Sequence, residues 1–313
     1  MAAIFASTAF ASFKEKPMLK DKYVKVNGVR LHYVTAGKGE LVLFLHGFPE
    51  FWYEWKNQLV EFGKDHQAVA PDMRGYNLSD KPSDLDSYKI GPLVEDIRAL
   101  ADHLSHNKKF VLVAHDWGGA LAWSFAIAHP EMLDKLVIIN APHPGVFAKL
   151  LASDPKQQQA SQYMLMFRSD KAEANLSANN YAGLVGAVLG AGLKSGAFTE
   201  DDKQAYIKAW SQPGALTGGL NYYRANRVGP PVPNSGGEAS TGNNFALDPN
   251  SLMVKVPTLV IWGEKDTALL TSNLDGLDQF VPQLTIKRIP DGSHWVIHEK
   301  TAEVNAAIRE FIR

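Results

Sequence analysis

Five short runs of mainly apolar residues limit the folds that this chain can adopt. They read LVLFL at 41–45, AVAP at 68–71, FVLV at 110–113, KLVIIN at 135–140 and TLVIW at 258–262. Continuous apolar runs of this length suit strands that are buried on both faces, as in a parallel sheet. Segments between the runs, such as 94–104, have the apolar spacing of helices. The alternation predicts an α/β fold with a mostly parallel central sheet flanked by helices.

Weaker signals extend this pattern at both ends. Residues 23–33 (YVKVNGVRLHY) predict a β-hairpin, because Asn27-Gly28 separates two runs of β-forming residues. A sixth strand is expected at 284–289 and a final helix at 302–312.

The alternation stops between about residues 144 and 255, where the spacing is helical and no strand-like run occurs. Residues 229–251 are dense in Gly, Pro, Asn and Ser and predict a long loop. We therefore expect a core built from residues 21–144 and 252–313, with a helical cap inserted at 145–251.

Residues 1–20 are interpreted as an N-terminal extension. The first 13 residues (MAAIFASTAFASF) are apolar, but the first basic residue, Lys14, follows them. A secretory signal usually carries its positive charge before the apolar region, so a targeting segment is the lesser alternative. No apolar run reaches the roughly 18 residues that a membrane span needs. We expect a cytoplasmic protein without a membrane span.

Composition excludes several functions. The chain has 32 Lys and Arg against 33 Asp and Glu, a net charge of -1, so it has no basic excess for a nucleic-acid partner. Cysteine is absent, which excludes a thiol nucleophile, an iron–sulfur cluster and a Cys-based zinc site. No phosphate-binding glycine loop follows the early strands. We expect no cofactor and no metal.

The segment FVLVAHDWGG at 110–119 predicts a strand, a sharp turn and an immediate helix, with Asp116 in the turn. This is the pattern of a nucleophile elbow, which usually reads Gly-x-Ser-x-Gly. Here a carboxylate takes the place of the serine at the nucleophile position. Gly118 matches the final glycine of the motif and allows the close packing that a tight turn from strand to helix needs. Asp116 could alternatively be a simple helix N-cap.

Two further motifs favour the catalytic interpretation. GEKD at 263–266 and GSHW at 292–295 place Asp266 and His294 just after predicted strands, at the edge of the sheet where active sites of this class lie. Taken singly, Asp266 could be an exposed turn residue and His294 a core histidine. Together with Asp116 they follow the order nucleophile, acid, histidine.

From about residue 20 to its end, the chain resembles the epoxide hydrolase branch of the α/β-hydrolase fold family. The resemblance rests on HGFPE at 46–50 and HDWGG at 115–119, on GEKD and GSHW, and on two cap segments, Gln162-Tyr163 and NYYR at 221–224. It implies a hydrolase that acts on an ether bond and converts a small-molecule epoxide and water to a vicinal diol through an alkyl ester on Asp116.

The resemblance also implies roles for individual residues. Asp116 is the nucleophile, His294 the general base, and Asp266 the acid that orients His294. Tyr163 and Tyr223 donate to the epoxide oxygen; Tyr222 is the less suited neighbour. The backbone N–H groups of Phe48 and Trp117 form the oxyanion hole. Substrate-binding roles are expected for His46, Pro49, Trp52 and Trp295.

Other polar residues have simpler interpretations. His115 is expected to be structural, Glu50 to bond a loop to a helix, and His143 to lie at the hinge of the cap. His294 and His298 have i, i+4 spacing, but no carboxylate cluster accompanies them, so zinc is not expected. Tyr163 and Tyr223 could merely pack within the cap.

Two other functions remain open at this point. A haloalkane dehalogenase-like enzyme would share the Asp, the His, the acid and the Trp after the nucleophile, but it commonly has Asn in place of Phe48 and needs no cap tyrosines. A non-catalytic binding protein of the same fold would be expected to have a degraded triad, whereas this one is complete. The elbow has no Ser, which argues against a serine esterase. The sequence does not indicate the oligomeric state or the particular epoxide.

Overall fold

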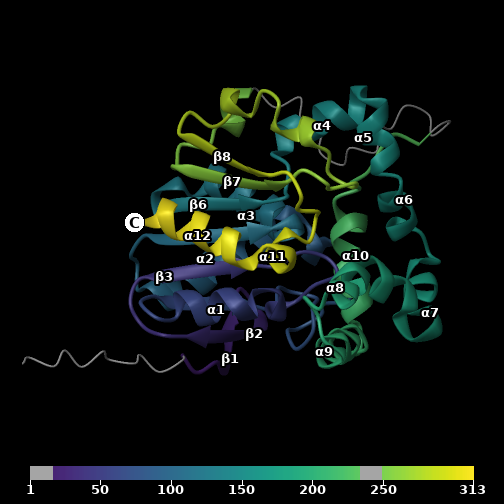
Figure 1. Ribbon diagram of the computed structural model, residues 1–313, viewed down its shortest axis with the longest axis horizontal. Helices are drawn as coiled ribbons and strands as arrows, with labels where there is room; N and C mark the ends of the chain where they lie inside the picture. Colours follow the sequence, from purple (N-terminus) through teal and green to yellow (C-terminus); the bar gives the residue numbers. More distant parts are fainter. Residues whose placement is uncertain (1–16, 233–248) are drawn as a thin grey trace, which may run out of the picture.

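The computed structural model describes residues 17–232 and 249–313. In this part of the chain, eight strands form one sheet in the order β1-β2-β4-β3-β5-β6-β7-β8 (Figure 1). The strands are β1 (Lys20–Val26), β2 (Val29–Ala36), β3 (Leu41–Leu45), β4 (Gln67–Pro71), β5 (Phe110–His115), β6 (Leu133–Ile139), β7 (Thr258–Gly263) and β8 (Leu284–Ile289). β1 and β2 pair antiparallel at one edge, and the strands from β4 to β8 pair parallel. The predicted α/β fold with a mostly parallel sheet is confirmed.

The hairpin at the antiparallel edge turns at the predicted dipeptide. Val26 pairs with Val29, so Asn27 and Gly28 alone form the turn. Both have a positive φ, 45° and 80°. This conformation matches the twist of the strands, and Asn and Gly adopt it at low cost.

Helices cover both faces of the sheet, which explains the uninterrupted apolar runs. One face carries α1 (Lys56–Phe62), α11 (Val296–Glu299) and α12 (Thr301–Ile312). The other carries α2 (Ile90–Ser105) and α3 (Asp116–Ala128). Within β3, Val42 and Phe44 pack with the first group, whereas Leu43 and Leu45 pack with the second. Successive side chains of a strand point to opposite faces, so every position of a central strand is buried.

The segment between β6 and β7 is helical where the structure describes it. It contains α4 (Pro144–Ser153), α5 (Pro155–Ala160), α6 (Tyr163–Arg168), α7 (Ala172–Leu184), α8 (Gly190–Ser195), α9 (Glu200–Trp210) and α10 (Ala215–Ala225). These helices lie together at one end of the sheet (Figure 1). The exact domain boundaries stay a prediction. Residues 1–16 of the predicted extension and 233–248 of the predicted loop lie outside the described residues.

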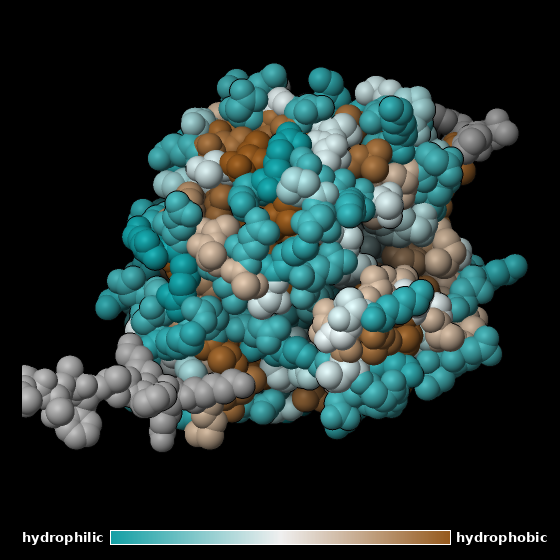
Figure 2. Space-filling model, in the orientation of Figure 1, coloured by the Kyte–Doolittle hydropathy of each residue, from teal (hydrophilic) through white to brown (hydrophobic). Residues whose placement is uncertain are grey.

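The face shown in Figure 2 is mainly hydrophilic, with hydrophobic residues in small separate patches. Among the described residues, no helix combines the length and the apolar character needed to cross a membrane.

Candidate active site

The elbow between β5 and α3 holds Asp116 in an unusual backbone conformation. Asp116 is the first residue of α3 and has a φ of 48°, in the left-handed region that residues with a side chain rarely adopt. The helix therefore begins four residues earlier than the apolar run from Ala120 suggests. Strained conformations of this kind persist only where the surrounding structure fixes them, and they concentrate at functional sites.

Glycines allow the elbow to approach its neighbours closely. A Cβ atom on Gly118 would lie 2.4 Å from the carbonyl oxygen of Leu45, and one on Gly119 would lie 2.2 Å from the Cβ of Ala141. On the facing loop, a Cβ on Gly47 would lie 2.3 Å from the Cβ of Asp116. The turn can therefore meet the loop after β3 only because Gly47 and Gly118 have no side chain, and Gly119 allows the same close approach to the segment after β6.

This close approach brings backbone donors to the carboxylate. The N–H of Phe48 donates to Asp116 Oδ1 at 2.8 Å. The backbone N–H of Trp117, in the first turn of α3, is a second donor to the carboxylate. These are the two backbone groups that the sequence predicts as the oxyanion hole.

His294 and Asp266 complete the cluster around Asp116. His294 Nδ1 lies 2.7 Å from Asp266 Oδ2, and its Nε2 lies 3.7 Å from Asp116 Oδ2. Asp266 Oδ1 accepts the backbone N–H groups of Ala268 and Leu269 at 2.8 and 2.9 Å. These two backbone donors fix the carboxylate of Asp266. Its contact with Nδ1 of His294 leaves Nε2 directed toward Asp116.

In this cluster, burial and the neighbouring charges shift the pKa values of His294 and Asp116 in opposite directions. Burial lowers the pKa of His294, but the negative charges of Asp266 and Asp116 outweigh it and raise that pKa to about 9. Burial raises the pKa of Asp116, while His294 and the two N–H donors partly offset the rise. His294 therefore lies between two carboxyl groups whose negative charges favour its protonated form.

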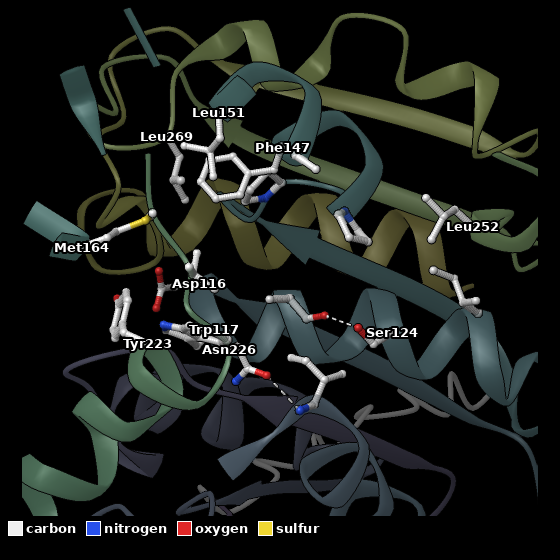
Figure 3. Close-up of a pocket in the computed structure, with 18 of the residues that line it drawn as sticks. Asp116, Trp117, Ser124, Phe147, Leu151, Met164, Tyr223, Asn226, Leu252 and Leu269 are labelled. Carbon is white, nitrogen blue, oxygen red and sulfur yellow. Dashed lines mark hydrogen bonds between the residues drawn. The ribbon is translucent and has the colours of Figure 1, made fainter. Parts of the chain in front are cut away.

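One cap tyrosine, Tyr223, lies beside the carboxylate, whereas Tyr163 is not among the described residues that line the cavity next to Asp116. Figure 3 shows Tyr223 of α10 beside Asp116, and its ring packs edge-on against Trp117, with centroids 5.1 Å apart. Phe167 lies between Tyr163 and Tyr223, with ring centroids 5.2 and 5.1 Å from theirs. Burial, and then the charge of Asp116, raise the pKa of both phenols well above its usual value, so both remain proton donors.

The neighbouring Tyr222 has a different partner. Its hydroxyl donates to the carbonyl oxygen of Arg74 at 2.8 Å, and its side chain is fully buried. This structural bond distinguishes it from Tyr223.

A cavity of about 630 Å³ opens beside Asp116 (Figure 3). Trp117, Met164 and Tyr223 line it near the carboxylate, whereas the four residues predicted to bind substrate are not among its described lining residues. Those four are His46, Pro49, Trp52 and Trp295.

Each of these four residues has another contact. His46 is buried, and its Nε2 accepts the backbone N–H of Met73 at 3.0 Å. Pro49 accepts the indole N–H of Trp210 at its carbonyl oxygen, 2.5 Å away. Trp52 donates its backbone N–H to Asp72. The ring of Trp295 packs edge-on against His294, with centroids 4.8 Å apart. They support the loops around the site.

A buried acidic cluster lies behind the triad, and the sequence interpretation missed it. His298 Nε2 lies 2.7 Å from Glu50 Oε1, and His115 Nδ1 lies 2.5 Å from Glu54 Oε1. The loop after β3 folds back and places Glu50 beside His298 and Glu54 beside His115, an arrangement that the sequence spacing of His294 and His298 does not reveal. His115 Nε2 also bonds the carbonyl oxygen of His294 at 2.9 Å, in keeping with its expected structural role.

One potential ligand atom from each of Glu50, Glu54 and His115 lies within 4.8 Å of the others, a spacing that fits a metal ion. The surroundings of the two glutamates affect their ionisation in opposite ways. Burial opposes ionisation of Glu50, but His298 outweighs it and lowers the pKa of Glu50 to about 2. Burial and the charge of Glu50 raise the pKa of Glu54 well above its usual value. These surroundings favour an ionised Glu50 beside a neutral Glu54.

Comparisons with known proteins identify the family of this chain. The family model of the alpha/beta hydrolase fold matches residues 40–301. An AB hydrolase superfamily protein of Bacillus subtilis is 40% identical, over 94% of this chain and 98% of its own length. Human epoxide hydrolase 4 is 38% identical, over 93% of this chain and 77% of its own length.

Among solved structures, a Bacillus megaterium epoxide hydrolase in complex with an inhibitor superposes with a TM-score of 0.82. It is 38% identical, and the match covers 93% of this chain and 99% of that one. The chain belongs to the α/β-hydrolase fold family. Within that family, its relatives and structural neighbours place it in the epoxide hydrolase branch.

The close approach at the elbow makes a stability prediction. Gly118→Ala should destabilise the protein by about 1–3 kcal/mol, because the new methyl group meets backbone atoms that cannot rotate away. Gly91→Ala, in the first turn of α2, is the control, since nothing lies within 4 Å of its added Cβ atom. Chemical unfolding of both variants checks this. Equal stability of the two variants would contradict the close packing of the elbow.

Proposed function

We propose that this enzyme hydrolyses epoxides to vicinal diols through a covalent ester on Asp116. The observation that carries the proposal is the carboxylate at the elbow, which has His294 on one side and the phenol of Tyr223 beside it. A carboxylate can attack a saturated carbon without prior deprotonation, and the phenols suit an alkoxide that needs a proton. All of these groups are side chains, so the reaction needs no cofactor.

In the first step, an oxygen of Asp116 attacks one ring carbon of the epoxide from the side opposite the ring oxygen. A C–O ester bond forms while the C–O bond of the ring breaks. The released alkoxide takes a proton from Tyr163 or Tyr223 and becomes a hydroxyl group. Because the pKa values of these phenols are raised, they hold their protons until the alkoxide appears.

In the second step, His294 acts as the base. Esterification removes the negative charge of Asp116, which is one cause of the raised pKa of His294, so the pKa of His294 falls. A proton held by His294 then passes to solvent, which leaves the neutral imidazole as the base, and it is taken up again when the carboxylate is restored. His294 takes a proton from water, and the hydroxide attacks the carbonyl carbon of the ester. The N–H groups of Phe48 and Trp117 stabilise the oxyanion that forms.

The collapse of this intermediate completes the cycle. The C–O bond to the diol breaks, and the departing oxygen takes the proton from His294. The carboxyl group of Asp116, which now contains the oxygen from water, returns a proton to the tyrosinate. The balance is one epoxide and one water consumed and one diol released.

The cap tyrosines favour this function over a dehalogenase, whose halide leaving group needs no proton. A complete triad likewise disfavours a binding protein without turnover. We further expect a cytoplasmic enzyme that acts on small molecules and has no nucleic-acid partner, in view of its net charge of -1.

The proposal predicts that the tyrosines act in the first step. Tyr163→Phe and Tyr223→Phe should each slow ester formation, and the double variant should slow it by about 10²–10⁴, because the alkoxide loses its proton donors. Rapid mixing with excess epoxide, followed by acid quench and mass spectrometry, measures this rate. Tyr222→Phe is the control and should keep the parent rate, since its hydroxyl bonds Arg74. An unchanged rate in the double variant would reject tyrosine assistance and favour the dehalogenase.

The proposal also predicts that His294 acts only in the second step. His294→Gln should react with an epoxide at mildly alkaline pH and then stall as the ester, because no base activates water. Intact-protein mass should rise by one substrate, and peptide mapping should place the gain on Asp116. The Asp266→Asn variant should accumulate less ester than His294→Gln, because it keeps the imidazole base and loses only the carboxylate that orients it.

The double variant Asp116→Asn with His294→Gln is the control and should gain no mass. A variant His294→Gln that turns over like the parent enzyme would remove His294 from the mechanism.

A further inference from the structure

The cavity beside Asp116 follows one face of α3. Its lining includes Asp116, Ala120, Ser124 and Ile127. These residues are separated by four, four and three positions, so they lie on one stripe of the helix. At 1.5 Å per residue, the stripe from Asp116 to Ile127 is about 16 Å long.

Asp116 lies near one end of this channel. Figure 3 shows Asp116 with Met164 and Tyr223 at one side of the view, and Ser124 and Leu252 toward the other. A reacting carbon must lie next to the carboxylate, so most of a substrate that fills the channel extends from one side of its epoxide.

The channel walls are apolar. Opposite α3, Phe147, Ala148 and Leu151 of α4 contribute to the lining, and Leu252 lines its far part. Such walls favour the binding of a hydrocarbon chain, because each apolar group of the substrate is transferred from water into an apolar environment.

Away from the reacting groups, the side chains of Ser124 and Asn226 are polar, and both are hydrogen-bonded within the protein. Ser124 donates its hydroxyl to the carbonyl oxygen of Ala120 at 3.0 Å. The Oδ1 of Asn226 accepts the N–H of Ile90 at 3.1 Å, and its Nδ2 donates to the carbonyl oxygens of Tyr88 and Tyr222.

Charge restricts the substrate further. Asp116 is the one ionisable acid among the described residues that line the channel, and no Lys, Arg or His is among them. A carboxylate or phosphate carried deep into the channel would be buried without a cation, which is costly.

We infer that the preferred substrates are terminal epoxides that carry a long, uncharged apolar tail, with the tail lying along α3 from Asp116 toward Leu252. This inference rests on the proposed function and specifies its substrate class. Epoxides in the middle of a long chain, and epoxides whose tail ends in a carboxylate, fit the channel poorly.

A chain-length series tests the inference. The substrates are the terminal epoxides of butane, hexane, octane and decane, and kcat/KM for diol formation is measured for each. We expect kcat/KM to rise about fourfold per added methylene group until the channel is filled, which corresponds to the burial of one CH₂ group. Equal values along the series, or a fall, would overturn the inference.

Two isomeric or matched substrates test position and charge. The decane epoxide with its ring in the middle of the chain should have a lower kcat/KM than the terminal one. The terminal epoxide with a carboxylate at the other end should be at least about tenfold worse than its uncharged analogue. A preference for either of these compounds would contradict the inferred channel.

A bulky substitution locates the tail within the protein. Ser124→Phe places a ring about 12 Å along the stripe from Asp116, about three-quarters of its length, so the ratio of kcat/KM for decane epoxide to that for butane epoxide should fall sharply. Ala128→Phe is the matched control, because Ala128 is exposed at the end of the same helix and is not part of the lining. Equal ratios in the two variants would show that the tail lies elsewhere.

A second variant covers the case in which Ser124→Phe fails to fold. Ile127→Ala enlarges the far part of the channel, so the rise with chain length should continue to longer tails than in the parent enzyme. An unchanged series would count against the channel. If no epoxide gives diol, the proposed function fails; if diol forms without regard to chain length, only the channel fails.

Discussion

The contact between the turn after β5 and the loop after β3 determines the rest of the site. It fixes Asp116 at a φ of 48° and brings the N–H of Phe48 to within 2.8 Å of its carboxylate. Glycines at 47 and 118 permit this approach, since a side chain at either position would overlap the facing segment. The same backbone donors that hold the resting carboxylate are then in place for the oxyanion of the second step, without rearrangement.

The charge of the nucleophile links the two steps. Before alkylation, the charge of Asp116 contributes to the raised pKa of His294, and a protonated His294 in turn favours the carboxylate form of Asp116. Alkylation turns the carboxylate into a neutral ester and removes this mutual stabilisation. The chemistry of the first step thus prepares the base for the second, while Asp266, fixed by two backbone N–H groups, keeps the imidazole oriented throughout.

The sequence predicted the strands, the hairpin at Asn27-Gly28 and the elbow well, because each depends on local residue types. The positions of Asp266 and His294 beside Asp116 followed from strand ends that meet at one edge of a parallel sheet. The environment of Glu50 and Glu54 was not predictable in this way, since their partners His298 and His115 are distant in sequence. The substrate-binding roles expected for His46 and Trp52 stay a prediction, because a motif identifies a loop, whereas packing decides which of its side chains face the cavity.

A single turnover in water enriched in heavy oxygen tests the covalent mechanism most directly. Enzyme in excess is mixed with a terminal epoxide, and both the protein and the diol are analysed by mass spectrometry. Water that attacks the ester carbonyl leaves its oxygen in the enzyme, so we expect the label in the side chain of Asp116 and an unlabelled diol. Label in the diol, with Asp116 unlabelled, would mean that water attacks the epoxide directly, and the ester on Asp116 would then be excluded.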